Sequence, residues 1–130
     1  MKFNYSDIFV TLSTDKLQQM VDFYTRLFNQ PAQVYRPSIY AEFQLKQLRL
    51  GIFQPQAQRQ EEFANHNNSM SLCLEVIDLE QAIAYLTDLG YPPPEAIIEA
   101  SHGREIYAYD PDGNRLIVHQ SATKKPEIQT

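Results

Sequence analysis

The 130-residue sequence is poor in cysteine, and this scarcity rules out several kinds of site. Cys73 is its only cysteine, so no disulfide can form within one chain. A four-cysteine or Cys₂His₂ zinc site is impossible for the same reason. A lone thiol fits a reducing compartment, and we expect a cytoplasmic protein.

Long apolar runs and an excess of basic residues are missing as well. No run approaches the roughly 20 apolar residues of a membrane helix, and the N-terminal MKFNYSDIF lacks the apolar segment of a signal peptide. We therefore expect no membrane association.

The formal net charge is −5, from 11 Lys and Arg against 16 Asp and Glu. An acidic chain argues against nucleic-acid binding, which needs a basic surface, and is compatible with neutral or cationic small molecules.

The sequence contains an internal repeat. Residues 17–27 align with 79–89 at an offset of 62, and residues 49–54 align with 115–120 at an offset of 66. Two amphipathic helices can match by chance, but a second match in the same order makes chance a poor explanation. We predict one domain over residues 1–130, with unit one at about 5–54, a connector at 55–68, unit two at about 69–120 and a polar tail at 121–130.

Both copies of the first repeated segment are predicted to be helices. Their apolar residues recur at i, i+3, i+4 and i+7. Asp15 with Gln18, and Asp78 with Gln81, match the capping-box pattern at the helix starts. Gly90 is expected to end the second helix.

Segments rich in β-branched and aromatic residues surround the two helices and predict strands. They lie at residues 8–13, 32–35, 40–45, 49–53, 71–76, 96–99, 104–109 and 116–119. The connector is expected to contain a helical turn at 59–64. The order is thus β-α-β-β-β twice, and the fold class is α+β. We predict two repeated units that form an incompletely closed eight-stranded barrel with the helices outside and a concave interior for a ligand.

Several motifs resemble those of one family, the glyoxalase, bleomycin resistance protein and extradiol dioxygenase (vicinal oxygen chelate) superfamily. Residues 10–12 followed by Phe23 and Tyr24 resemble the first strand and helix of that fold. Residues 74–76 with 89–91 resemble the opening of its second unit. Residues 109–114, with the sequence YDPDGN, resemble its last hairpin and form the most specific motif. The resemblance covers nearly the whole chain.

The resemblance also implies where a metal would bind. Metal-dependent members typically place a histidine on the first strand of each unit and a glutamate or similar donor on the last. The corresponding positions here are Phe9, Gly51, Ser71 and Ile117. Three of these side chains cannot bind a divalent cation, and serine is a poor ligand. A two-residue shift, which keeps the sheet face, brings in Thr11, Cys73 and His119, which do not make a ligand set. We predict no metal, no cofactor and no catalytic residue.

Residues on strands that should line the interior are the candidates for ligand contact. They are Phe9, Thr11, Tyr40, Phe43, Ser71, Cys73, Arg104, Tyr107, Tyr109, Ile117 and His119. Their aromatic character suits a planar or partly cationic organic ligand, and Arg104 adds a charge at the rim. His119 is interpreted as an edge residue or a ligand contact, Glu75 as a rim or solvent carboxylate, and His66 and His102 as solvated loop residues.

Three functions are compatible with this sequence. The first is a metal-free binding protein of the bleomycin-resistance type that sequesters or carries an organic small molecule. The second is a glyoxalase- or dioxygenase-like enzyme with unusual metal ligands such as His119 and Glu75. The third is a ligand-free structural or regulatory module, since a fold does not fix a function. The resemblance also implies a homodimer.

Overall fold

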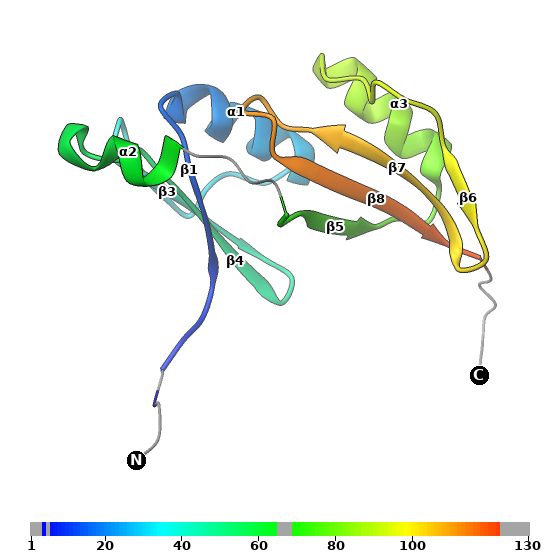
Figure 1. Ribbon diagram of the computed structural model, residues 1–130, viewed down its shortest axis with the longest axis horizontal. Coiled ribbons are helices and arrows are strands. Elements are labelled where there is room, and N and C mark those ends of the chain that lie inside the picture. The colour runs from blue at the N-terminus through cyan, green and yellow to red at the C-terminus, as the bar shows by residue number, and fades with distance from the viewer. Residues whose placement is uncertain (1–3, 5, 65–68, 123–130) are drawn as a thin grey trace. The chain divides into compact units, whose positions relative to one another are not determined.

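The computed structural model describes residues 4, 6–64 and 69–122 of the chain (Figure 1). The chain divides into two compact units, Met1–His66 and Asn67–Thr130. The boundary falls within the predicted connector, between the two sequence repeats. Two segments lie outside the described residues: residues 65–68 of that connector, which include His66, and residues 123–130 of the predicted tail.

The first unit contains one helix and a four-stranded sheet. Its elements are β1 (Val10–Ser13), α1 (Leu17–Phe28), β2 (Val34–Arg36), β3 (Tyr40–Leu45) and β4 (Leu48–Phe53). The strand order is β1-β4-β3-β2, with β1 parallel to β4 and the other neighbours antiparallel. The helical turn expected after this sheet is confirmed as η1 (Ala57–Arg59) and α2 (Gln60–Ala64).

The second unit repeats this arrangement, which confirms the α+β class and the two β-α-β-β-β units. Its elements are β5 (Leu72–Glu75), α3 (Leu79–Leu89), β6 (Ile98–Ala100), β7 (Gly103–Tyr109) and β8 (Arg115–Ser121). The strand order β5-β8-β7-β6 is the counterpart of the first sheet. Within the described residues the eight strands pair as two separate four-stranded sheets, and no strand of one sheet is hydrogen-bonded to a strand of the other.

The start and end of α3 follow the sequence prediction. The Asp78 side chain accepts a hydrogen bond from the Gln81 backbone N–H at 3.0 Å. This contact satisfies one of the free donors at the helix start. Gly90 ends the helix in the left-handed conformation, with φ of 99°.

The capping prediction at α1 is wrong. The N-cap is Lys16, with no side-chain hydrogen bond to the helix, and Asp15 lies one position too early to serve. Thr14 takes a local role instead, because its Oγ1 accepts a hydrogen bond from the Lys16 N–H at 3.0 Å. The helix is held by its apolar side, where Leu17, Met20 and other residues are buried.

Each sheet has one face packed against the helix of its own unit. Side chains alternate between the two faces of a strand. In the first unit Ala41, Phe43, Leu50 and Ile52 are fully buried, and the Phe43 ring lies 6.4 Å from Tyr24 of α1. In the second unit the buried apolar residues of the helix and sheet are Leu79, Leu86, Ile106, Ala108, Leu116 and Val118. We call this the covered face of each sheet and the opposite side its open face.

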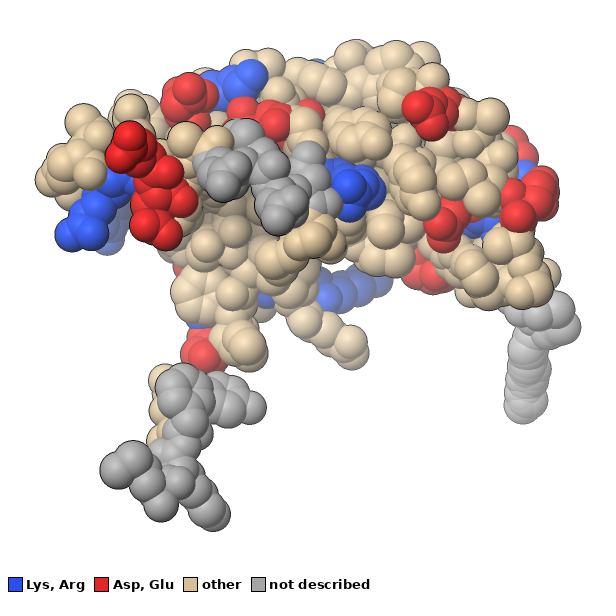
Figure 2. All heavy atoms as spheres, in the orientation of Figure 1, with Lys and Arg blue, Asp and Glu red and all other residues tan. Residues whose placement is uncertain are grey.

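Figure 2 shows Asp and Glu side chains at several separate places on the face that it draws. On the face drawn in Figure 2, Lys and Arg side chains do not gather into one continuous patch. No helix among the described residues combines the length and apolar character needed to cross a bilayer.

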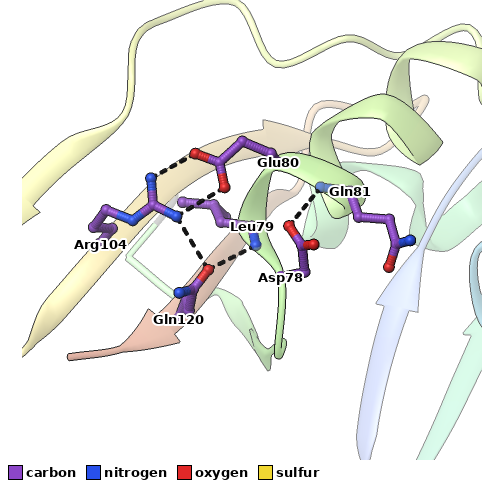
Figure 3. Close-up of polar contacts among 6 residues, drawn as sticks. All are labelled: Asp78, Leu79, Glu80, Gln81, Arg104 and Gln120. Carbon is purple, nitrogen blue, oxygen red and sulfur yellow. Dashed lines mark hydrogen bonds and ion pairs between the residues drawn. The ribbon is translucent and has the colours of Figure 1, made fainter. Parts of the chain in front are cut away.

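An ion pair from β7 and hydrogen bonds to Gln120 of β8 connect these strands to the start of α3 (Figure 3). Arg104 donates to both carboxylate oxygens of Glu80, at 2.6 and 2.8 Å. It also donates to Gln120 Oε1 at 3.1 Å, and the same oxygen accepts from the Leu79 N–H at 2.8 Å. The two-pronged contact from Arg104 lowers the pKa of Glu80 to about 2.

Glu80→Gln is expected to remove an acid-sensitive contribution to stability. Glu80 stays ionised in the folded protein at a pH where the unfolded chain takes up the proton, so the pair stabilises the fold above about pH 4.5 and stops doing so as pH falls through about 2. Urea unfolding at several pH values should give a slightly lower free energy of unfolding for the variant than for the native chain at pH 7. This difference should vanish near pH 2. Glu95→Gln, in an exposed loop, is the control. An equal deficit at pH 7 and pH 2 would contradict this account.

Candidate functional site

The open face of the second sheet carries most of the chemistry-bearing side chains of that unit. Alternation places these residues on it: Cys73 and Glu75 from β5, Glu105, Tyr107 and Tyr109 from β7, and Arg115, Ile117 and His119 from β8. The pairing register aligns them in rows across the three strands. Ile117 lies between Cys73 and Tyr107, and the next row places His119 between Glu75 and Glu105.

The row around His119 forms a chain of polar contacts. His119 Nδ1 lies 2.7 Å from Glu75 Oε1, and His119 Nε2 lies 3.0 Å from His102 Nδ1. The two imidazole rings are stacked, with centroids 5.1 Å apart and an interplanar angle of 28°. An ionised carboxylate can only accept a hydrogen bond, so the contact with Glu75 places the His119 proton on Nδ1. The lone pair of His119 Nε2 then faces His102.

Glu75 is held in place from a second direction. Its Oε2 accepts hydrogen bonds from the Ser121 N–H at 3.0 Å and from the Ser121 hydroxyl at 2.7 Å. Partial desolvation alone would raise the pKa of Glu75, but the hydrogen bonds from His119 and Ser121 outweigh it and lower the pKa below its usual value. The side chain is exposed, as predicted, and it is an ionised, oriented acceptor for His119.

The β6–β7 turn brings His102 to the end of β8. Gly103 follows it with φ of 142°, and a Cβ built there would lie only 2.2 Å from the backbone oxygen of Gln120. Only glycine allows so close an approach. The turn is tied down by a hydrogen bond from the Ala122 N–H to the His102 carbonyl at 3.1 Å. His102 is exposed, as expected, but this hydrogen bond fixes its backbone against the end of β8.

Cys73 shows no sign of nucleophilic activation. Burial raises the pKa of its thiol, and the nearby carboxylates of Glu75 and Glu105 raise it further. A reactive cysteine needs the opposite environment, with positive charge that favours the thiolate. The thiol therefore offers a polarizable contact surface rather than a reactive group.

In the first unit, both family donor positions are taken up by other contacts. Gly51 is buried, and a Cβ built there would lie 2.9 Å from the Tyr40 hydroxyl oxygen and 3.3 Å from the Thr11 methyl. Tyr40 donates to Glu42 at 2.8 Å, and its pKa is raised by burial and by that carboxylate. Phe9 precedes β1 and lies with its ring centroid 4.0 Å from the Arg49 guanidinium carbon.

The two donor positions of the second unit are also occupied by side chains that do not suit a metal ion. The Ser71 hydroxyl accepts a hydrogen bond from Arg115 at 2.8 Å, so a cation already approaches it. Ile117 is half-buried on the open face and offers only a hydrocarbon surface. The side chains at the family's four donor positions therefore do not fit a metal ion, because none of them supplies an imidazole or carboxylate.

Two of the predicted ligand contacts lie on the covered faces, and the structure corrects them. Phe43 is fully buried against Tyr24 and Phe28 in the core of the first unit. Arg104 pairs with Glu80 at the start of α3, on the face opposite Tyr107. Strand alternation contains the signal: residues 105, 107 and 109 share one face, and 104 belongs to the other.

Two further residues were missed as site candidates. Glu105 follows from the same alternation, since it lies two positions before Tyr107. His102 could not be placed from sequence, because its position depends on the close approach of the Gly103 backbone to β8. Together with His119 these residues form a group of three whose nitrogen and oxygen atoms lie within 4.8 Å of one another.

A protein-family profile matches most of the chain. The profile of the Glyoxalase/Bleomycin resistance protein/Dioxygenase superfamily matches residues 8–118. The chain belongs to this superfamily. The match spans both units, so the resemblance of the YDPDGN turn and the two helices is confirmed.

Solved structures of the superfamily share the fold at low sequence identity. A glyoxalase-related enzyme from Fulvimarina pelagi has a TM-score of 0.71 at 19% identity, over 90% of this chain and 89% of the other. A lactoylglutathione lyase from Agrobacterium tumefaciens has a TM-score of 0.66 at 21% identity, over 89% and 94%. A glyoxalase/bleomycin resistance protein/dioxygenase from Nocardioides has a TM-score of 0.71 at 19% identity, over 97% and 91%. No curated protein sequence matches the chain.

Proposed function

We propose that this superfamily member binds an organic small molecule on the open face of its second sheet, without a metal at the family's donor positions. The observation that carries the proposal is the composition of that face. Tyr107, Tyr109 and Ile117 are half-buried there beside the Cys73 thiol and are not packed against α3. Aromatic and aliphatic side chains with a few oriented polar groups are typical of small-molecule sites.

The charges on this face favour one class of ligand. Glu75 is an anchored carboxylate and Glu105 lies in the same row, so a cationic or hydrogen-bond-donating group would be recognised there. Tyrosine faces also attract planar and cationic groups. We therefore propose a planar, partly cationic organic compound as the ligand. Thr11 and Tyr40 lie on the open face of the first sheet, and their role as ligand contacts stays a prediction separate from this site.

A binding screen on chelator-treated protein tests the proposal. Calorimetric titration with a panel of planar aromatic cations is expected to find at least one compound that binds without added metal. Tyr107→Ala should weaken that affinity about 10-fold, which corresponds to the loss of one aromatic contact worth about 1.4 kcal/mol. Tyr85→Ala, an exposed tyrosine of α3, is the matched control and should bind as the native chain does. Failure of every compound to bind unless a metal is supplied would overturn the proposal and favour an enzyme with unusual ligands.

We also propose that the protein is a cytoplasmic homodimer. The single free thiol supports a reducing compartment. Sedimentation equilibrium should give twice the 15.1 kDa mass of one chain. A mass of one chain at micromolar concentration would contradict the dimer and leave the binding proposal untouched.

A further inference from the structure

We propose that His102, Glu105 and His119 form a binding site for a divalent transition-metal ion such as Zn²⁺. Their candidate ligand atoms lie within 4.8 Å of one another. The site is separate from the family's four donor positions, because His119 lies two residues beyond Ile117 on β8 and His102 lies in the β6–β7 turn. It does not depend on the binding of an organic compound.

The ligand types suit such an ion. Two imidazole nitrogens and one carboxylate are a common protein ligand set for zinc and for other first-row metals. Three protein ligands leave a fourth position for water or for a donor atom of a bound molecule. Glu105 and His119 are half-buried, whereas His102 is exposed, so the ion would be reached from solvent on the side of the turn.

The spacing of the two imidazoles also fits. His102 Nδ1 and His119 Nε2 are 3.0 Å apart. Two nitrogens bound tetrahedrally at about 2.0–2.1 Å from zinc lie about 3.3 Å from each other. A widening of a few tenths of an ångström would therefore admit the ion between them. Glu105 is the Cα partner of His119 across the β7–β8 pair and supplies the third donor from the neighbouring strand.

The surroundings prepare His119 for this role. Metal-bound histidines usually donate their other ring N–H to a carboxylate, which fixes the tautomer and the ring orientation. Glu75 accepts from His119 Nδ1 at 2.7 Å, and Ser121 holds that carboxylate with two hydrogen bonds. The Nε2 lone pair of His119 thereby points at His102 Nδ1, across the position that the metal ion would take.

All the residues of the proposed site belong to the second unit. A simple hydrogen-bonded chain, His102 to His119 to Glu75, would explain two of the contacts without a metal. Such a chain does not involve Glu105, whose carboxylate accepts only a long hydrogen bond, of 3.4 Å, from the Tyr107 hydroxyl among the described residues. The contribution of Glu105 therefore separates the two interpretations.

Zinc titration of the untagged, chelator-treated full chain tests the site. Calorimetry is expected to show one Zn²⁺ per chain. His102→Ala should weaken the affinity more than about 100-fold, and Glu75→Gln about 10- to 100-fold as the loss of an outer partner. His102 lies in an exposed turn, so its replacement leaves the fold intact. His66→Ala is the matched control, since the chain has three histidines and His66 is the third.

Cobalt gives a second readout of the ligand set. Co²⁺ in a four-coordinate protein site has intense visible absorption, and we expect this band in the native chain and its loss in Glu105→Gln. Glu95→Gln should keep the band. The proposal is overturned if the native chain binds no stoichiometric Zn²⁺, or if His102→Ala and Glu105→Gln both bind as the native chain does. Organic-compound binding, measured with chelator present, reports independently on the proposed function.

Discussion

Gly103→Ala is expected to lower the free energy of unfolding of the second unit by about 3 kcal/mol. Two effects add at this position. A side chain at φ of 142° strains the backbone by about 1–3 kcal/mol. The new Cβ would also lie 2.2 Å from the Gln120 oxygen and 3.0 Å from the Ala122 nitrogen, so β7 and β8 must move apart, at a further cost of about 1–3 kcal/mol.

Gly113→Ala separates the two effects. Gly113 also has a positive φ, of 84°, but nothing lies within 4 Å of a Cβ built there. It should therefore show the backbone strain alone. Urea unfolding followed by circular dichroism compares the two variants directly. Equal destabilisation by both would mean that the close approach to β8 contributes nothing.

The same substitution should also disturb the proposed metal site. Gly103 lets the turn lie against the end of β8, and this is what brings His102 within 3.0 Å of His119. We expect Gly103→Ala to weaken Zn²⁺ binding at a temperature where the variant is still folded. Gly113→Ala, in the turn between β7 and β8 at the other end of these strands, should not.

Phe43→Ala is expected to destabilise the first unit by about 3–5 kcal/mol, the usual range for removing a buried phenylalanine. Its side chain is fully buried, with its ring centroid 6.4 Å from that of Tyr24 and 6.5 Å from that of Phe28. The substitution would leave a cavity between β3 and α1 that the surrounding rings cannot fill without moving. The urea midpoint should fall accordingly.

A matched control tests whether Phe43 has the core role or the ligand role. Phe9→Ala removes the same ring at a position that is 41% exposed, and we expect less than about 1 kcal/mol of destabilisation. Ligand affinity measured on folded Phe43→Ala protein should match that of the native chain. Loss of binding without loss of stability would show that Phe43 contacts the ligand after all.

The repeat and the periodic patterns were enough to predict the fold. The match between residues 17–27 and 79–89 reflects a physical repeat, because α1 and α3 each cover a sheet of the same strand order. The YDPDGN turn is also local. Asp110 accepts from the N–H groups of Asp112 and Asn114, both at 2.9 Å, so one buried carboxylate organises the whole turn.

Strand ends and one helix cap were harder to predict. Residues 8–13 predict a strand, yet β1 begins at Val10, and the aromatic Phe9 before it packs under Arg49 instead. Thr14 rather than Asp15 makes the local contact before α1. These boundaries depend on tertiary contacts that a propensity pattern does not contain.

The candidate site depended on long-range geometry. Gly51 matches a donor position in sequence, but only the structure shows that the Tyr40 hydroxyl is the atom a side chain there would meet. Likewise, His102 and His119 are 17 positions apart and meet through one hairpin. Contacts of this kind follow from the register of β7 with β8, which the sequence pattern determines only to within a shift.

The central claim is that the superfamily fold is kept here while ligand binding needs no metal at the family's donor positions. Nitrogen-15 NMR spectra of the chelator-treated protein, recorded as a binding compound is added, test it most directly. The account predicts shifts in the amide signals of Cys73, Tyr107 and Ile117, with the signals of α3 largely unchanged. Shifts on addition of the compound that appear only after a divalent metal is restored, in His102→Ala as well as in the native chain, or that map to α3 instead, would contradict it.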